Sequence, residues 1–350
     1  MIDPHIGHLH SLLVADAFHR FNQLQQSDPT IFSTGTDEHG IKVQRAAEAK
    51  GLEPKLFCDQ VSDRFEKLCR EFNVSNTTFI RTTDPEHEKA VHAFWNKLQE
   101  NGHIYKSKYQ GWYCSSDEAF VTSVEDETTT AADGTKVTKK VSSESGNEVE
   151  WIEEENYMFK LSVFQGQLLE WLDRKPQVIV PDTFHSLVKQ SVSKGLEDLS
   201  ISRPSNRLTW AIKVPNDPNQ TIYVWLDALV NYLTVSGYPS QITIWPPNLQ
   251  VIGKDILKFH AIYWPAFLMA TGMEPPNRIL CHSHWTINDL KMSKSKGNVV
   301  DPFKKSNHVT PEGLRYFLLR QGLPHQDGSK YHLYQSSTIF IQINPELIHG

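Results

Sequence analysis

The sequence has 350 residues, 39% of them hydrophobic and 22% charged, which is enough for two or more domains with their own cores. A small disulfide-held module is excluded, because the four cysteines stand far apart without a CxxC pair, a pattern that also predicts reduced thiols and no structural zinc. The formal net charge of -6 excludes a generally basic surface, so a nucleic acid would bind to local patches of Lys and Arg. No apolar stretch approaches the roughly 20 residues that cross a bilayer, and the first residues do not resemble a targeting segment.

Residues 1–103 are predicted to form the first half of an α/β catalytic domain. Apolar residues at positions 9, 12, 13, 17, 21 and 24 have helical spacing, which predicts a helix that begins near residue 7. Residues 30–34 read as a short buried strand, with a turn at its carboxyl end. Two further helices are predicted at 54–72 and 86–100, the second ended by Gly102. Strands and helices in alternation favour a parallel sheet.

Residues 104–202 are predicted to form a unit inserted into that sheet. Residues 105–120 are rich in aromatic side chains, and residues 122–150 are rich in Thr, Ser and Glu, which is typical of a loop or hairpin insertion. Helical periodicity follows over residues 151–202. We expect an inserted connective domain without zinc.

The α/β pattern resumes after residue 202, where residues 208–214 and 221–225 read as strands. Neither half has enough strands alone, so one interrupted sheet explains the pattern better than three independent domains. The predicted fold is therefore α/β, a Rossmann-like parallel sheet split by an inserted connective domain. Residues 203–290 would form the second half of the catalytic domain.

Chemistry is expected at the start of the first helix, where residues 5–8 read His-Ile-Gly-His. Backbone N–H groups and the positive end of the helix dipole make such a terminus an anion site, and phosphate is its natural guest. His5 and His8 project from nearly the same face, and Gly7 has no side chain to obstruct a nucleotide. Alone, these four residues are equally typical of two surface histidines near a chain end.

A second motif, Lys-Met-Ser-Lys-Ser-Lys-Gly-Asn at residues 291–298, combines three lysines with small, flexible residues. Such a loop suits a polyphosphate, although most lysine-rich octamers are solvated basic loops. The two motifs together, in this order, resemble the HIGH and KMSKS signature pair of the class I aminoacyl-tRNA synthetases. The resemblance favours phosphate binding for both.

Segments between the two motifs resemble the methionyl-tRNA synthetases, and the match runs from about residue 4 to residue 322. Residues 226–234, 259–267 and 282–285 are most similar to the mitochondrial members, which implies a location in the mitochondrial matrix. The absence of zinc-binding cysteines fits that branch. The segments that carry the resemblance are residues 35–40 (Gly-Thr-Asp-Glu-His-Gly), 111–114 (Gly-Trp-Tyr-Cys), 155–157 (Glu-Asn-Tyr), 223–228 (Tyr-Val-Trp-Leu-Asp-Ala), 252–256 (Ile-Gly-Lys-Asp-Ile) and His260.

The resemblance assigns methionine recognition to seven residues. The Asp37 carboxylate would hold the substrate ammonium, a charge-assisted contact that leaves the substrate carboxylate able to attack; from position alone it is equally a turn residue. The other six would form the side-chain pocket, with aromatic faces for a polarisable thioether. The four within residues 225–232 have helical spacing and are equally typical of plain core. The six are Trp225, Ala228, Leu229, Tyr232, Ile256 and His260.

ATP binding is likewise assigned from the resemblance. Asp255 would accept hydrogen bonds from ribose hydroxyls, as carboxylates do in other nucleotide-binding α/β folds. Four residues would be catalytic and would stabilise charge on the phosphate oxygens, together with substrate-bound Mg²⁺; Lys294 ranks first among them. No metal ligand is assigned, and His282 and His284 have no assigned role. The catalytic set is His5, His8, Lys291 and Lys294, and the ATP-binding set adds Gly7, Gly253 and Asp255.

The implied reaction is the activation of methionine and its transfer to tRNA. The methionine carboxylate attacks the α-phosphorus of ATP, pyrophosphate leaves, and the methionyl group passes to the 3′ end of a methionine tRNA. We expect a monomer that contacts the acceptor end of that tRNA.

Both ends of the sequence depart from the family pattern. Family members carry a strand immediately before the first motif and a helical anticodon-binding domain after the second, so we expect a chain truncated at both ends. Residues 291–350 would hold the KMSKS loop, the start of a stem region and a divergent tail. Two alternatives stay open: a non-catalytic fragment of the enzyme, and another ATP-dependent enzyme that adenylates a small acid.

Overall fold

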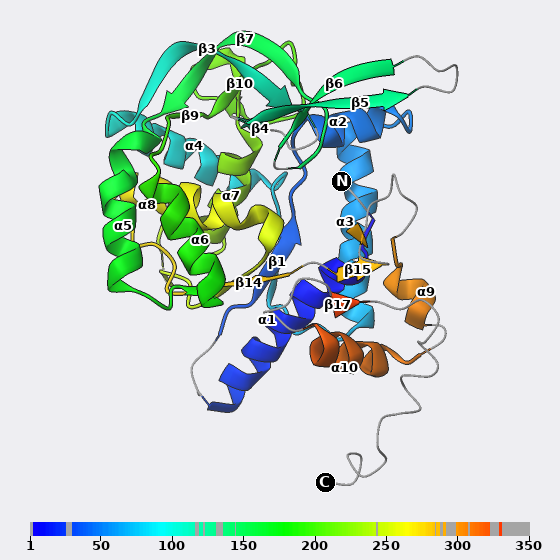
Figure 1. Ribbon diagram of the computed structural model, residues 1–350. Coiled ribbons are helices and arrows are strands. Elements are labelled where there is room, and N and C mark those ends of the chain that lie inside the picture. Colours follow the sequence, from blue (N-terminus) through cyan, green and yellow to red (C-terminus); the bar gives the residue numbers. More distant parts are fainter. Residues whose placement is uncertain are drawn as a thin grey trace.

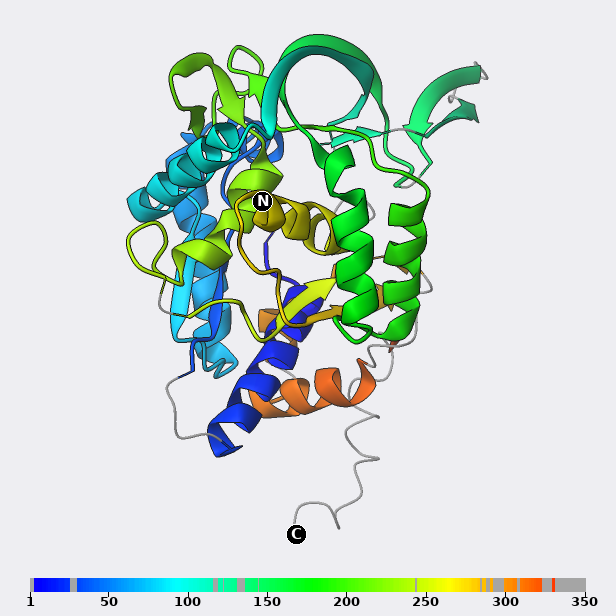
Figure 2. The ribbon, with the colours of Figure 1, turned by 90° about the vertical axis from the view of Figure 1, so that its left-hand side faces the viewer.

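The computed structural model describes residues 3–25, 30–115, 119–121, 123–130, 136–143, 145–242, 244–283, 285–287, 290–291, 299–306, 309–322 and 329–330. Antiparallel strands lie at one end of the molecule, and helices α1 and α10 lie at the other (Figure 1). The parallel strands and the helices around them fill the region between, as the view turned by 90° also shows (Figure 2).

The predicted helices of the first 100 residues are present. Helix α1 (Ile6–Gln25) buries Leu9 and Leu13 completely, as the apolar spacing predicts. Helices α3 (Pro54–Glu71) and α4 (Pro85–Glu100) each begin with proline, whose missing N–H costs nothing in the first turn of a helix.

Helix α2 (Ile41–Glu48) is an addition to the prediction. It follows Gly40, whose φ of 104° turns the chain sharply after the first strand. Its buried residues, Ile41, Val43 and Ala47, are too few to give a strong periodic signal in a helix of eight residues.

Parallel strands confirm the α/β class, but within the described residues they do not form one sheet. A short mixed sheet holds the parallel pair of β15 (Trp285–Ile287) and β17 (Ser329–Lys330), and the other parallel strands form two sheets. In one, β1 (Ser33–Thr36) pairs with β2 (Thr78–Arg81). In the other, β14 (Ile279–His282) lies between β13 (Gln250–Gly253) and β8 (Ile179–Val180). Strands β1 and β13 are therefore edge strands, each paired along one side. Strand β8 lies inside the segment predicted to be inserted, and the domain boundaries stay predictions.

Gly35 is required by the close approach of β1 to β2. It lies opposite Ile80, and a Cβ at position 35 would come within 1.8 Å of the Ile80 carbonyl oxygen. Any side chain here would force the two strands apart just before the turn that carries Asp37.

Antiparallel strands form the unit at the end of the molecule opposite α1 and α10 (Figure 1). The prediction of helical structure from residue 151 is wrong for its first part, because residues 150–159 form strand β7, which pairs with β3 along ten residue pairs. A hairpin interpretation of residues 122–150 is correct. The strands are β3 (Ile104–Cys114), β4 (Ala119–Val121), β7 (Glu150–Phe159) and β9 (Leu199–Ser200) in one sheet, and β5 (Val124–Thr130) and β6 (Lys136–Ser142) in the hairpin.

Helices do follow in the rest of that segment, and the strands expected next are shorter than predicted. Only Lys213–Val214 of the first expected strand is extended, as β11, and the second ends at Ile222. Trp225 instead lies in the first turn of helix α7. Burial of one face of this helix outweighs the strand propensity of its residues. The elements are η1 (Leu161–Phe164), α5 (Gln165–Arg174), α6 (Asp182–Ser193), β10 (Ser202–Pro204), β11 (Lys213–Val214), β12 (Asp217–Ile222) and α7 (Val224–Thr234).

The main core lies beneath the antiparallel unit and includes the fully buried rings of Trp95 and Trp264. A second core joins α1 to α10, where Leu13 packs with Leu314 and Leu318. The remaining elements are η2 (Lys254–Ile256), the π-helix η3 (Phe259–Tyr263), α8 (Trp264–Ala270), β15 (Trp285–Ile287), β16 (Leu290–Lys291), α9 (Pro302–Ser306), α10 (Pro311–Gln321) and β17 (Ser329–Lys330).

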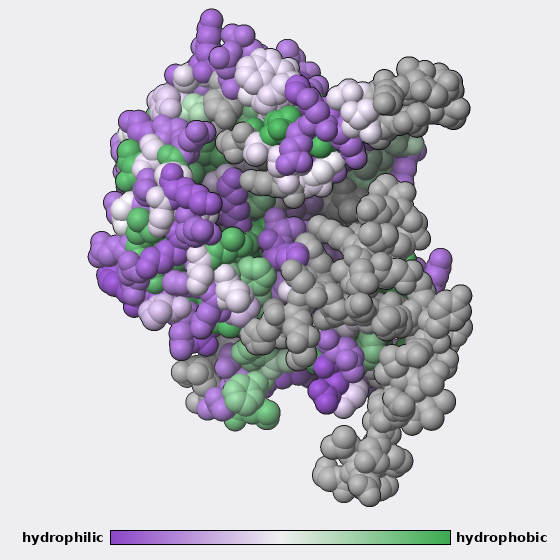
Figure 3. Space-filling model, viewed as in Figure 1, coloured by the Kyte–Doolittle hydropathy of each residue, from purple (hydrophilic) through white to green (hydrophobic). Residues whose placement is uncertain are grey.

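Hydrophilic residues dominate the coloured surface seen in Figure 3, and hydrophobic ones are scattered among them. The C-terminal half of α1 leaves Phe21 and Leu24 exposed. None of the helices in the described residues is long and apolar enough to cross a membrane.

Candidate functional site

The two histidines of the first motif form a stacked pair at the start of α1. Their ring centroids are 3.8 Å apart, and the ring of His8 also meets Phe65 edge-on at 5.2 Å. The Nδ1 atom of His8 accepts the backbone N–H of His5, and Nδ1 of His5 accepts the backbone N–H of Gly7. Side chains therefore satisfy two backbone donors that a helix start leaves without partners.

These hydrogen bonds determine which ring nitrogen carries the proton. Because both Nδ1 atoms accept, each neutral ring carries its proton on Nε2. Burial, with a further effect of the nearby His5, lowers the pKa of His8 to about 3. His8 is thus a neutral hydrogen-bond donor at neutral pH, and the positive end of the α1 dipole lies beside it.

Gly253 and Asp255 lie at the carboxyl end of β13, beside α1. Gly253 pairs with His282 on β14, and a Cβ at position 253 would come within 2.8 Å of the Asp255 carboxylate. The Nε2 atom of His282 lies 2.7 Å from the Ser11 hydroxyl on α1. The unassigned His282 thus connects the strand that precedes Asp255 to the helix that carries the histidine pair.

The segment that follows the lysine-rich motif returns to the same helix start. The backbone N–H of Ile6 donates to the carbonyl oxygen of Val300 over 3.1 Å. Lys291 ends strand β16, but its side chain, Lys294 and His284 lie outside the described residues. Their roles stay predictions.

The expected methionine pocket brings together α7 and the turns after β13. Nε2 of His260 lies 2.9 Å from the Tyr232 hydroxyl, and Nδ1 donates to the carbonyl oxygen of Ile256. With Nδ1 protonated, Nε2 of the neutral ring accepts the tyrosine proton. Burial lowers the pKa of His260 to about 4 and raises the pKa of Tyr232, so both groups are uncharged at neutral pH.

Aromatic rings form a wall beside this pair. Trp225 stacks on Phe259 with centroids 3.8 Å apart and an interplanar angle of 8°, and its ring meets His260 edge-on. Ala228 is partly buried on the same helix. Leu229 belongs to the main core and is 1% exposed, and its place in the methionine pocket stays a prediction.

Asp37 is exposed, and its two following neighbours are buried. Glu38 accepts two hydrogen bonds from the Arg81 guanidinium, at 2.7 and 2.9 Å, and one from Thr83. His39 lies 2.8 Å from the Asp227 carboxylate on α7. The turn after β1 is therefore held from both sides next to the position that would meet the substrate ammonium.

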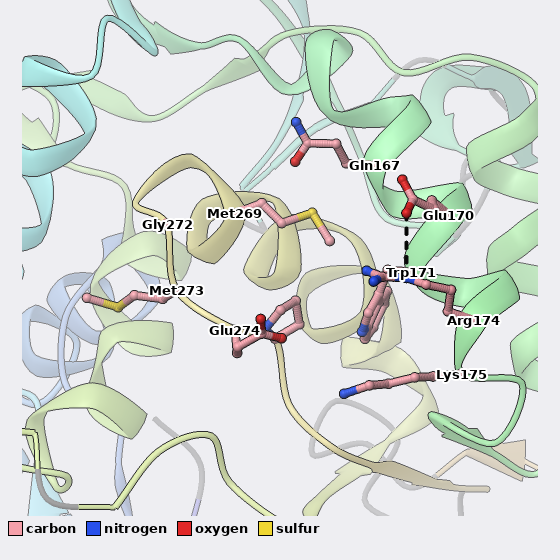
Figure 4. A pocket seen from close by; sticks show the side chains of 10 residues that line it. Gln167, Glu170, Trp171, Arg174, Lys175, Met269, Gly272, Met273 and Glu274 are labelled. Carbon is pink, nitrogen blue, oxygen red and sulfur yellow. Dashed lines mark ion pairs between the residues drawn. The ribbon is translucent and has the colours of Figure 1, made fainter.

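A separate pocket of about 530 Å³ lies between α5 and the loop after α8 (Figure 4). The side chains of Met269 and Trp171 contribute apolar surface, and the ion pair between Glu170 and Arg174 lies at its edge. None of its lining residues belongs to the predicted site. Within the described residues, no group of three or more His, Cys, Asp or Glu side chains is arranged to hold a metal ion.

Comparison with known families is decisive. The profile of the family described as tRNA synthetases class I (M) matches residues 2–350. The chain belongs to this methionyl-tRNA synthetase family. The resemblance stated from the motifs is thereby confirmed.

Curated relatives include mitochondrial members of the family. The mitochondrial methionine–tRNA ligase of Homo sapiens is 53% identical over 332 residues, which cover 94% of this chain and 56% of the relative. The probable mitochondrial methionine–tRNA ligase of Dictyostelium discoideum is 51% identical, with 93% and 58% covered. This chain therefore spans a little over half the length of these relatives.

Solved structures agree with the sequence relatives. Mycobacterium tuberculosis methionyl-tRNA synthetase bound by methionyl-adenylate matches with a TM-score of 0.89 and 41% identity, over 99% of this chain and 67% of that chain. The free form of the same enzyme matches with a TM-score of 0.78 and 37% identity, over 99% of this chain and 64% of that chain. The α/β class I fold follows from these matches.

Sequence reasoning missed the polar partners behind the site, above all His39, His87 and Asp227. A signal was present, because Asp227 is a lone carboxylate in the otherwise apolar run of residues 224–230. A buried carboxylate needs partners, and these come from two other elements of the chain.

Proposed function

We propose that this chain activates methionine with ATP to form methionyl-adenylate and transfers the methionyl group to the 3′ end of a methionine tRNA. One arrangement carries the proposal: a pair of neutral histidines starts α1, and an uncharged aromatic pocket built on α7 lies at the turns after β13. The first part suits phosphate and the second suits an apolar amino-acid side chain.

Methionine would be held at two points. The Asp37 carboxylate would bind the ammonium group by a charge-assisted hydrogen bond. The thioether would lie against Trp225 and the His260–Tyr232 pair, with Ala228, Leu229 and Ile256 completing the pocket. An uncharged His260 supports this assignment, because a cationic ring would carry a hydration shell that a thioether cannot replace.

ATP would lie across the start of α1. Its adenosine would meet Gly253 and Asp255, and its phosphates would meet His5, Gly7 and His8. Lys291 and Lys294 would approach the phosphates from the lysine-rich segment. Mg²⁺ would arrive with the nucleotide and neutralise part of its charge.

In the reaction, the methionine carboxylate oxygen attacks the α-phosphorus in line, and the bond to the pyrophosphate oxygen breaks. Negative charge builds on the phosphate oxygens, and the Nε2–H groups of His5 and His8 are suited to stabilise it. A ribose hydroxyl of tRNA then attacks the adenylate carbonyl, and AMP leaves. We further propose a monomer located in the mitochondrial matrix that contacts the acceptor end of tRNA.

Amino-acid-dependent exchange of pyrophosphate into ATP tests the proposal directly. The purified chain would be assayed with methionine, leucine, isoleucine, valine and a simple carboxylic acid, and we expect exchange with methionine alone. Exchange with another acid would support a different adenylating enzyme. Methionine binding by calorimetry without exchange would support the non-catalytic alternative.

Lys294→Ala is expected to lower methionine-dependent exchange about a hundredfold, because a lysine contact to the phosphates would be lost in the transition state. Methionine affinity, measured by calorimetry, should change little. Lys305→Ala, which removes a lysine of the nearby helix α9, is the matched control and should keep the exchange rate. Equal rates for both variants would remove Lys294 from the mechanism.

A further inference from the structure

Asp227 is a buried carboxylate that joins three elements. It lies in the first turn of α7 and is 1% exposed. One oxygen lies 2.8 Å from Nδ1 of His39 in the turn after β1, and the other lies 2.8 Å from Nε2 of His87 on α4. Since an ionised carboxylate only accepts hydrogen bonds, Nδ1 of His39 and Nε2 of His87 both carry protons.

Charge strengthens the contact to His39. Burial acts to lower the pKa of His39, but the attraction and hydrogen bond of Asp227, with the further attraction of Asp37 and Glu38, together raise it. Burial likewise acts to raise the pKa of Asp227, and the attraction of His39 with the hydrogen bonds of both histidines lowers it. The Asp227–His39 contact is therefore a charge-assisted hydrogen bond shielded from solvent, which is costly to break from one side.

His87 anchors the other side of this cluster. It is completely buried, and its Nδ1 atom lies 2.9 Å from the hydroxyl of Thr234, at the far end of α7. Helix α7 is thus attached to α4 at both its first and its last turn. Rotation or sliding of α7 would break at least one of these hydrogen bonds.

The cluster connects the two proposed ends of the amino-acid site. His39 is two residues from Asp37, and the residue between them, Glu38, is tied to Arg81. On the other side, Asp227 is two residues from Trp225 and precedes Ala228. The contact between His39 and Asp227 thus links the turn after β1 directly to α7.

We propose that Asp227 is a positioning residue that fixes the separation between Asp37 and the side-chain pocket on α7. The inference rests on the proposed function, because it takes Asp37 and α7 as the two holding points for methionine. A ligand that touches both points gains from their fixed separation, since little conformational freedom is lost when it binds. Loss of the contact between Asp227 and His39 would weaken methionine binding and leave ATP binding unchanged.

Asp227→Asn keeps the shape of the side chain but removes its charge and one of its two acceptor oxygens. We expect the KM for methionine in pyrophosphate exchange to rise about tenfold or more, and the KM for ATP to change less than about twofold. Asp16→Asn is the matched control. Asp16 is also completely buried and hydrogen-bonded, to Ser75, Arg20 and Arg315, but it lies away from the pocket. The Asp16→Asn substitution should lower Tm and leave the KM for methionine unchanged.

A double-mutant cycle separates positioning from simple destabilisation. If Asp227 acts through Asp37, the variant with both Asp37→Asn and Asp227→Asn binds methionine about as weakly as Asp37→Asn alone. Additive losses, or equal rises in the KM for methionine and the KM for ATP, would overturn the proposal. If the unaltered chain shows no exchange, the same variants can be compared by calorimetric methionine binding. A failure of the proposed activity is then distinguished from a failure of the positioning role.

Variants of His39 provide a second test of the proposal if Asp227→Asn does not fold. His39→Asn retains an amide N–H close to the place of Nδ1, whereas His39→Leu retains no donor. We expect methionine affinity to be largely kept in the first variant and reduced in the second. Equal affinities in these two variants would contradict the positioning role.

Discussion

Replacing His8 with asparagine is expected to slow methionine-dependent pyrophosphate exchange about 10²–10³-fold, the usual effect of removing one pre-positioned donor. The amide oxygen of asparagine can still accept the His5 N–H, as Nδ1 does over 3.2 Å, so the start of α1 should be retained. What disappears is the proton on Nε2. Since that donor would act on the transition state in the proposed mechanism, kcat should fall while calorimetric methionine affinity stays close to its original value.

His8→Gln is the complementary variant. Its amide nitrogen reaches the region of Nε2, but it offers no acceptor at the place of Nδ1, so it should retain more exchange activity than His8→Asn and lose more stability. The reverse order of activities would mean that His8 acts by shaping the helix start instead of donating to phosphate. A normal rate in His8→Asn would exclude a direct role in activation.

Acid is expected to destabilise this chain through its buried histidines, and His10 is the clearest case. Its ring is 2% exposed, Nε2 donates to the Gly322 carbonyl oxygen over 3.2 Å, and Nδ1 has no partner in the described structure. Burial, followed by repulsion from His282, lowers the pKa of His10 from 6.5 to about 4. The folded chain therefore keeps His10 neutral where the unfolded chain takes up a proton.

The direction of the effect follows from this difference. Above pH 6.5 neither state is protonated at His10, so the residue contributes no pH dependence. As the pH falls from 6.5 to 4, unfolding is favoured by about 1.4 kcal/mol per pH unit, to a limit of about 3 kcal/mol.

His10→Gln removes this titration and keeps an N–H donor for Gly322. Urea unfolding at pH 7.5 and pH 5 should show the variant gaining about 2 kcal/mol on the original chain between the two conditions. Because both proteins share every other histidine, the comparison isolates His10. A constant difference between the two pH values would show that the ring is protonated in the folded state.

The sequence predicted those helices that depend on the spacing of residues close together in the chain. The spacing of Leu9 and Leu13 predicted α1, and the helices predicted at 54–72 and 86–100 are α3 and α4. Residues 151–159 were expected to be helical because they belong to the segment 151–202, which was assigned helical periodicity. The ten-pair ladder between β7 and β3 joins distant parts of the sequence, and no periodicity within residues 151–159 reveals it.

The site divides in the same way. Short motifs identified His5, Gly7 and His8, and the structure explains them by hydrogen bonds between residues two or three positions apart. Asp227 and His39 are 188 positions apart, so their contact depends on the complete fold. A familiar motif predicts the residues that would meet a ligand, but no motif predicts the residues that hold them in place.

Strands β1 and β13, each at an edge of its sheet, have a consequence for the behaviour of this chain in solution. Within the described residues, each presents one side of its backbone without a neighbouring strand. Where solvent reaches such an edge, its backbone donors and acceptors attract extended segments of any origin, including those of other copies. Aggregation at high protein concentration is the hazard. An extended peptide that covers these edges would act as a folding aid.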